Sequence, residues 1–144
     1  VETAIQMTLT ELNENLREIY AEAYTQKEAL GFILKETAKE LHQIFGVYQP
    51  SLTEADFLAM EVGSAGMMRG FMVQPCDASF PLEKKLSCFL NMSLRAYRVS
   101  EGELEEVLAY METLDMRAIA QQVMHQLFSA LAMQYDFSLQ GLED

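Results

Sequence analysis

The sequence contains no tryptophan and, among its 144 residues, only three prolines, two cysteines and two histidines. Two cysteines, Cys76 and Cys88, are too few for the disulfide framework of a small secreted domain. No apolar run approaches the ~20 residues that a membrane-spanning helix needs. The sequence therefore excludes disulfide-rich and membrane-spanning classes of protein, and we expect a cytoplasmic domain with no membrane partner.

Basic residues are also scarce. Lys and Arg number 10 against 22 Asp and Glu, which gives a formal net charge of -12. Such a field repels phosphate groups and anionic membrane surfaces. The chain by itself is therefore a poor candidate for binding DNA or RNA, and a neutral or cationic partner fits it better.

Half of the residues are apolar, and 144 residues are enough for one domain with its own core. Apolar residues recur at helical spacing, and no segment alternates long enough to predict a strand. We predict an all-α single helical-bundle domain over residues 1–144. Its six helices are expected at the chain start to about 23, then at about 26–45, 54–73 (one helix or two short ones), 81–97, 101–113 and 115–134.

Several of these helices have a recognisable start. The capping-box pattern S/T-x-x-E occurs in Thr25–Glu28, Ser51–Glu54 and Ser100–Glu103. In this pattern the hydroxyl accepts from a first-turn amide and the carboxylate reaches back to the cap amide. Ser79 with Pro81 and Asp115 predict two further starts.

The first predicted helix is amphipathic from its outset. Its apolar stripe is formed at three- and four-residue steps by Ile5, Leu9, Leu12, Leu16 and Ile19. The chain thus opens inside a helix without a cap, and we expect another segment to precede it in a longer protein.

The segment Phe57–Val73 is apolar on nearly all sides and carries Gly63, Gly66 and Gly70 among several methionines. Glycine costs a helix about 1 kcal/mol relative to alanine, so its repetition predicts a packing or cavity role. Two interpretations stay open and are compatible. One is a central core helix with close crossings, and the other is one wall of an apolar pocket.

The last predicted helix has a stripe wider than a helix covering a monomer core requires. The stripe contains Met116, Ile119, Ala120, Val123, Met124, Leu127, Phe128 and Leu131. Burial on two sides would explain this width, which favours packing against a second copy. A central helix in a monomeric bundle is the alternative.

No catalytic or metal-binding pattern is present. Helical di-metal sites use Glu-x-x-His, but Lys39 and Gln122 stand three residues before His42 and His125. We therefore expect no cofactor, no metal and no enzymatic activity. Cys88 is expected in the core, and Cys76 in a loop.

The order of the helices resembles the C-terminal ligand-binding and dimerisation domain of TetR-family transcriptional regulators. TLTELNENLREIYAEA (Thr8–Ala23) resembles the helix that follows the DNA-binding headpiece in that family. MEVGSAGMMRGFM (Met60–Met72) resembles its central helix. SLRAYRVSEGELEEVL and DMRAIAQQVMHQLFSAL, within Leu82–Met133, resemble its closing helices. The resemblance covers nearly the whole chain, but the helix-turn-helix headpiece of the family is absent from these residues.

The resemblance implies a homodimeric effector-sensing domain of a probable repressor. It would bind a small apolar or amphipathic molecule among its central helices and contact DNA only through the missing headpiece. From helical phase, the ligand-binding candidates are Phe32, Met67, Met68, Phe71, Phe89, Met92 and Tyr97. The dimer candidates are Leu86, Leu90, Val123, Met124, Leu127, Phe128 and Leu131.

Two other functions fit the same sequence. The first is an acidic helical protein–protein interaction module with no small-molecule ligand, which a cavity-free interior would favour. The second is an enzyme or cofactor carrier built on a helical bundle, which needs a set of ligating residues that the spacing does not provide.

Overall fold

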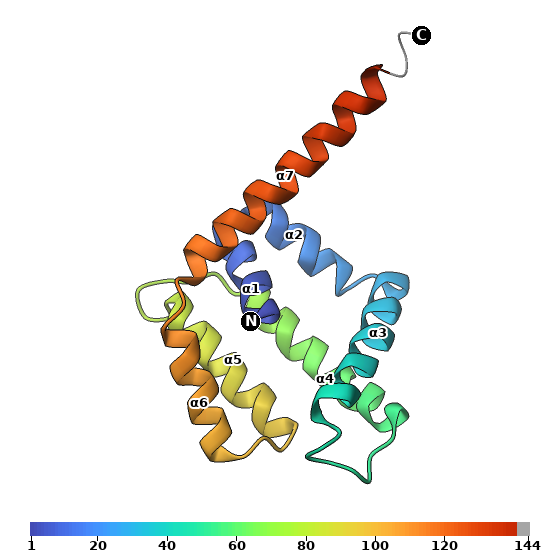
Figure 1. Ribbon diagram of the computed structural model, residues 1–144, viewed down its shortest axis with the longest axis vertical. Helices are drawn as coiled ribbons and strands as arrows, with labels where there is room; N and C mark the ends of the chain where they lie inside the picture. Colours follow the sequence, from blue (N-terminus) through green and yellow to red (C-terminus); the bar gives the residue numbers. More distant parts are fainter. Residues whose placement is uncertain (141–144) are drawn as a thin grey trace.

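The computed structural model describes residues 1–140 of the chain (Figure 1). Its helices are α1 (Glu2–Leu12), α2 (Glu14–Ala23), α3 (Lys27–Phe45), α4 (Glu54–Val73), α5 (Leu82–Ala96), α6 (Glu101–Glu112) and α7 (Met116–Gln140). No strand occurs in residues 1–140. The prediction of an all-α fold is confirmed, with one helix more than expected in this range.

The helices are arranged around α1, which packs against α2, α4, α5 and α7. The pairs α3–α4 and α5–α6 form helical hairpins on either side of it (Figure 1). The α7 helix crosses α1 and then continues away from the other helices (Figure 1). The centre of the molecule therefore depends on the first helix of the chain, and its last helix is only partly covered.

The single N-terminal helix predicted to run to about residue 23 is in fact two helices. Asn13 adopts an extended conformation with φ −144° and ψ 115°, and its side chain accepts a hydrogen bond from the amide of Leu16 at 3.1 Å. Asparagine competes for backbone donors in this way, which favours caps over helix interiors. The apolar stripe continues across the break, so periodicity alone did not reveal it.

The predicted helix starts have mixed outcomes. Ser100 forms the predicted capping box with Glu103 at the start of α6, and Asp115 accepts from the amide of Ala118 at 3.0 Å. Pro81 is the N-cap of α5 and stands before its first turn, where we had expected it inside that turn.

Two predicted capping boxes are wrong. The Thr25 hydroxyl donates to the Ala21 carbonyl at 2.8 Å, so it belongs to the end of α2, and Gln26 is the N-cap of α3. The capping box of α4 is formed by Thr53 and Asp56 in place of Ser51. A competing side chain two residues away thus decided the start of α4, whereas α3 begins at Gln26 without a side-chain cap bond.

The α4 helix is a single helix that buries one face. The buried residues recur mostly at four-residue steps and are Phe57, Glu61, Ala65, Met68 and Met72. A Cβ added at Gly63, Gly66 or Gly70 would meet no atom within 4 Å. The prediction that these glycines serve close packing or a cavity is therefore wrong within this chain, because they face open space.

The core lies where α1, α4, α5 and the start of α7 meet. Its buried members are Ala4, Met7, Met68, Met72, Leu82, Leu86, Phe89 and Met116. Methionine fills irregular spaces between helices that cross at different angles. The predicted end of the last helix near residue 134 is wrong, because α7 continues to Gln140.

Candidate functional site

A cavity of about 310 Å³ lies between α5, α6 and the start of α7. Its lining residues are Leu82, Glu83, Leu86, Ser87, Leu90, Leu108, Met111, Glu112, Leu114, Asp115, Met116 and Arg117. The apolar members Leu82, Leu86 and Met116 are buried, whereas the charged members are exposed. The space thus has an apolar floor and a charged rim, which is the usual form of a small-molecule site.

The rim of this cavity is predominantly acidic. Arg117, at the start of α7, forms an ion pair with Glu83 of α5, and this contact lowers the pKa of Glu83 below its usual value. Asp115 caps α7 through the amide of Ala118. Glu112 forms no ion pair with another residue in the described part of the chain. Its carboxylate therefore remains available at the mouth of the cavity.

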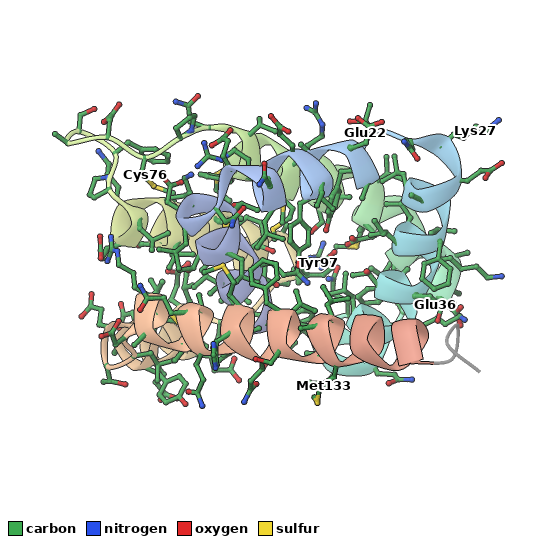
Figure 2. The ribbon with its side chains drawn as sticks, turned by 90° about the horizontal axis from the view of Figure 1, so that it is seen from above. Glu22, Lys27, Glu36, Cys76, Tyr97 and Met133 are labelled. Carbon is green, nitrogen blue, oxygen red and sulfur yellow. The ribbon has the colours of Figure 1, made fainter. Side chains whose placement is uncertain are left out.

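The α7 helix changes its surroundings along its length. Met116 is 6% exposed and Ala120 is fully buried, whereas Leu127, Leu131 and Met133 are 44%, 44% and 60% exposed. Ala120, Leu127 and Leu131 lie on one stripe at helical spacing. The face of α7 that is buried at Ala120 therefore continues as an uncovered apolar face at Leu127 and Leu131. Figure 2 shows the Met133 side chain pointing away from the helical body.

Glu61 of α4 is buried inside the bundle, with only 4% of its surface exposed. The Tyr97 hydroxyl donates to its Oε2 at 3.4 Å, and Ser64 also contacts it. No ion pair with Glu61 occurs among the described residues. Burial raises the pKa of Glu61 to about 7, against the opposing effect of both hydrogen bonds.

Tyr97, which contacts this carboxylate, belongs to an aromatic stack. The Tyr97 ring stacks on Phe45 with centroids 4.8 Å apart and on Phe57 with centroids 6.1 Å apart. Burial raises the pKa of Tyr97 and of Tyr24 to about 12. Tyr97 lies centrally between the helices (Figure 2). The cluster therefore joins a buried carboxyl group with a raised pKa to a tyrosine whose pKa is also raised by burial.

Glu11 is the second carboxylate turned toward the interior, at the end of α1. Its Oε2 accepts from Lys85 Nζ at 3.1 Å and from Arg17 at 3.2 Å, while its Oε1 accepts from the Cys76 amide at 3.0 Å. Burial alone would raise the pKa of Glu11, but the hydrogen bonds from Cys76 and Lys85 lower it. Lys85 is completely buried and also donates to the Gln74 carbonyl. This cluster ties α1, α2 and α5 to the loop before α5.

The residues predicted to bind a ligand fall into separate places. Four of them lie in or against one packed core cluster: Met67, Met68, Phe71 and Phe89. Phe71 and Phe89 meet edge to face, with centroids 5.9 Å apart. Tyr97 belongs to the Glu61 cluster, whereas Phe32 and Met92 are 69% and 52% exposed. None of the seven lines the cavity between α5, α6 and α7.

The predicted dimer residues also divide into groups. Leu127, Phe128 and Leu131 are exposed on the outer half of α7, and Val123 and Met124 are half-buried on its inner half. Leu86 is a core residue, and Leu86 and Leu90 both line the cavity. The exposed group remains a predicted interface, and the α5 pair serves packing within this chain.

Neither the two histidines nor the two cysteines line the cavity. The His42 ring packs against Phe57 with centroids 5.1 Å apart, and His125 is exposed. Cys76 and Cys88 are both half-buried. The described residues contain no group of three or more His, Cys, Asp or Glu side chains placed to hold a metal ion. Within the same residues no helix is both long and apolar enough to cross a bilayer.

The sequence prediction missed both the cavity and the Glu61 cluster. The cavity depends on how α6 folds back on α5, which helical phase does not determine. Glu61 carried a usable signal, because it is the only carboxylate within the apolar segment Phe57–Val73. A charged residue inside such a segment points either to a break in the buried face or to a buried polar contact.

No protein-family model, curated protein or solved structure matches this chain.

Proposed function

We propose that this chain is the effector-sensing and dimerisation domain of a ligand-responsive transcriptional regulator. The regulator is a repressor, and its effector is a small apolar or amphipathic molecule. One observation carries the proposal. The α7 helix begins in the wall of a ligand-sized cavity and exposes the apolar side chains of Leu127, Phe128 and Leu131 farther along. A single rigid element thus joins a space for an effector to a surface suited to a second copy.

The proposed mechanism uses this continuity. A molecule in the cavity contacts Met116 and the turn before it, and so favours one angle of α7 relative to α5 and α6. In a dimer that packs through the outer half of α7, a changed angle alters the relative placement of the two protomers. The ligand can shift the balance between the two arrangements only by as much as its affinities for them differ. DNA contact belongs, on the resemblance to TetR-family regulators, to a headpiece outside this chain.

A second candidate function is an interaction module. Phe32 of α3 and Leu58 and Val62 of α4 are 69%, 40% and 60% exposed, and a shallow apolar groove runs between these two helices. A partner helix that docks in this groove would need no small-molecule effector.

A thermal-shift screen with a matched pair of variants tests the proposed site. Ser87→Leu adds a side chain to the cavity wall, and Ala96→Leu adds the same side chain on exposed α5 surface. We expect small amphipathic compounds to raise the melting temperature of the wild type and of Ala96→Leu but not of Ser87→Leu. Equal shifts in all three proteins would place binding elsewhere, and no shift with any compound would favour the interaction module.

A further inference from the structure

We infer that the cavity between α5, α6 and α7 binds an amphipathic amine, with its apolar part on the leucine and methionine floor and its cationic nitrogen at the acidic rim. This inference rests on the proposed function and names the chemical class of its effector. It is carried by the shape of the cavity and by the distribution of charge around it.

The floor of the cavity selects an apolar body. Leu82 and Leu86 of α5 and Met116 of α7 are 2%, 7% and 6% exposed, and leucines and a methionine from α6 and the following turn complete the wall. Among residues 1–133, no aromatic side chain lines the space. Ligand pockets typically measure about 300–1,000 Å³, so about 310 Å³ suits a short alkyl chain or a single small ring system.

The rim selects positive charge. The charged groups that line the cavity are the three carboxylates of Glu83, Glu112 and Asp115 and the single guanidinium of Arg117. That guanidinium is engaged by Glu83, and Asp115 is engaged by the α7 backbone. Glu112 is thus the carboxylate best placed to meet a ligand cation, because it forms no ion pair within residues 1–133, where side chains are described.

The other ligand classes fit less well. An anionic amphiphile would meet the acidic rim and the net charge of -12, both of which oppose its approach. A neutral alcohol would gain binding energy by burying its apolar chain on the floor, but it would leave the Glu112 carboxylate without a counter-charge. A cation alone, such as a metal ion, would gain nothing from the apolar floor. Only a molecule with both features uses the whole lining.

Calorimetric titration of the full chain with three compounds that each carry an eight-carbon chain tests the inference. Octyltrimethylammonium, 1-octanol and octanoate share the chain and differ in the charge of the head group. We expect octyltrimethylammonium to bind about 10-fold more tightly than 1-octanol, a difference typical of one partly exposed charge contact. We expect octanoate to bind weakest of the three. Added salt should weaken only the cation.

A pair of glutamate variants on α6 locates the contact. Glu112→Gln should weaken octyltrimethylammonium about 5-fold and leave 1-octanol unchanged, whereas Glu106→Gln, on exposed surface outside the cavity, should change neither. Glu112 is itself exposed, so both variants are expected to fold, which circular dichroism verifies.

The failures of the two proposals are distinguishable. If 1-octanol binds as tightly as the cation and Ser87→Leu abolishes both, the amine class is overturned while the effector site stands. If Glu112→Gln has no effect on the cation, the acidic rim is not the recognition element and the inference fails. If none of the three compounds binds, the effector site itself is contradicted.

Discussion

Glu11 and Glu61 are two glutamates turned into the same bundle, and their surroundings shift their acidity in opposite directions. Glu11 receives Lys85, Arg17 and a backbone amide, and its pKa is lowered. Glu61 receives a tyrosine hydroxyl and a serine, and its pKa is raised to about 7. At Glu61 burial outweighs the hydrogen bonds from neutral partners, whereas at the less buried Glu11 the Cys76 amide and the Lys85 ammonium together outweigh burial.

The two carboxylates therefore stabilise the fold over different pH ranges. The lowered pKa of Glu11 means that its contribution is present above about pH 4.5 and is lost as the pH falls through its folded pKa. The raised pKa of Glu61 means that its contribution is complete below about pH 4.5 and is lost as the pH rises toward 7. Four substitutions test this contrast, in order of decreasing effect.

Removal of the buried Lys85 ammonium should have the largest effect on the unfolding free energy. Lys85→Met leaves Glu11 and the Gln74 carbonyl without their shared donor, which we expect to cost about 3 kcal/mol of unfolding free energy. Lys84→Met is the matched control, because Lys84 is exposed and reaches only the Ser79 carbonyl at 3.3 Å. Urea denaturation measures both variants. Equal losses would mean that the Glu11 cluster adds little to stability.

Removal of the Arg17 guanidinium should have the next largest effect on the unfolding free energy. Arg17 is 8% exposed and its Nε donates to the Thr10 carbonyl at 3.1 Å across the break between α1 and α2. Arg17→Met should therefore cost about 2 kcal/mol. Glu14→Gln removes only the exposed side of the same network and should cost less than about 0.5 kcal/mol. A small loss in Arg17→Met would contradict a role in holding the break.

Neutralisation of Glu61 should change the pH dependence of the unfolding free energy. Between pH 4.5 and about 7 the wild type should lose stability through Glu61 as the pH rises. After allowance for solvent screening the expected loss is about 1 kcal/mol. Glu61→Gln should remove this part of the slope, and Glu54→Gln, on the exposed start of α4, should leave it intact. An unchanged slope in Glu61→Gln would show that another group titrates there.

Removal of the tyrosine hydroxyl should have the smallest effect. Tyr97→Phe deletes the donor to Glu61, so the pKa of Glu61 should rise further. Carbon-detected NMR titration of the glutamate carboxyl groups measures the midpoint. Tyr48→Phe, which removes an exposed contact to Glu103, should leave that midpoint in place. A downward shift in Tyr97→Phe would contradict the hydrogen-bond assignment.

The sequence predicted the helices better than it predicted their contacts. Apolar periodicity located the helical segments and the all-α class, because a 3.6-residue repeat is a local property. It overlooked the break at Asn13, whose side chain caps α2, and it misplaced two helix starts. The start of α4 is capped by Thr53, and α3 begins at Gln26 without a side-chain cap bond.

The candidate sites were less predictable, because they depend on which faces meet. Met68 and Phe89 were predicted to line a pocket, and both are buried members of the packed core. The cavity residues Leu108 and Met111 gave no signal in the sequence, because an apolar residue beside a space looks like one in a packed core. Leu127 and Leu131 lie on the apolar stripe that the sequence predicted, and they are exposed as an interface would require.

Sedimentation velocity of the full 16.4 kDa chain across micromolar concentrations tests the central claim most directly. The account predicts a dimer of about twice that mass, which Phe128→Glu converts to a folded monomer because the charge lies on the uncovered face of α7. A wild-type chain that remains a monomer at every concentration, or a Phe128→Glu variant that dimerises as the wild type does, would contradict the account.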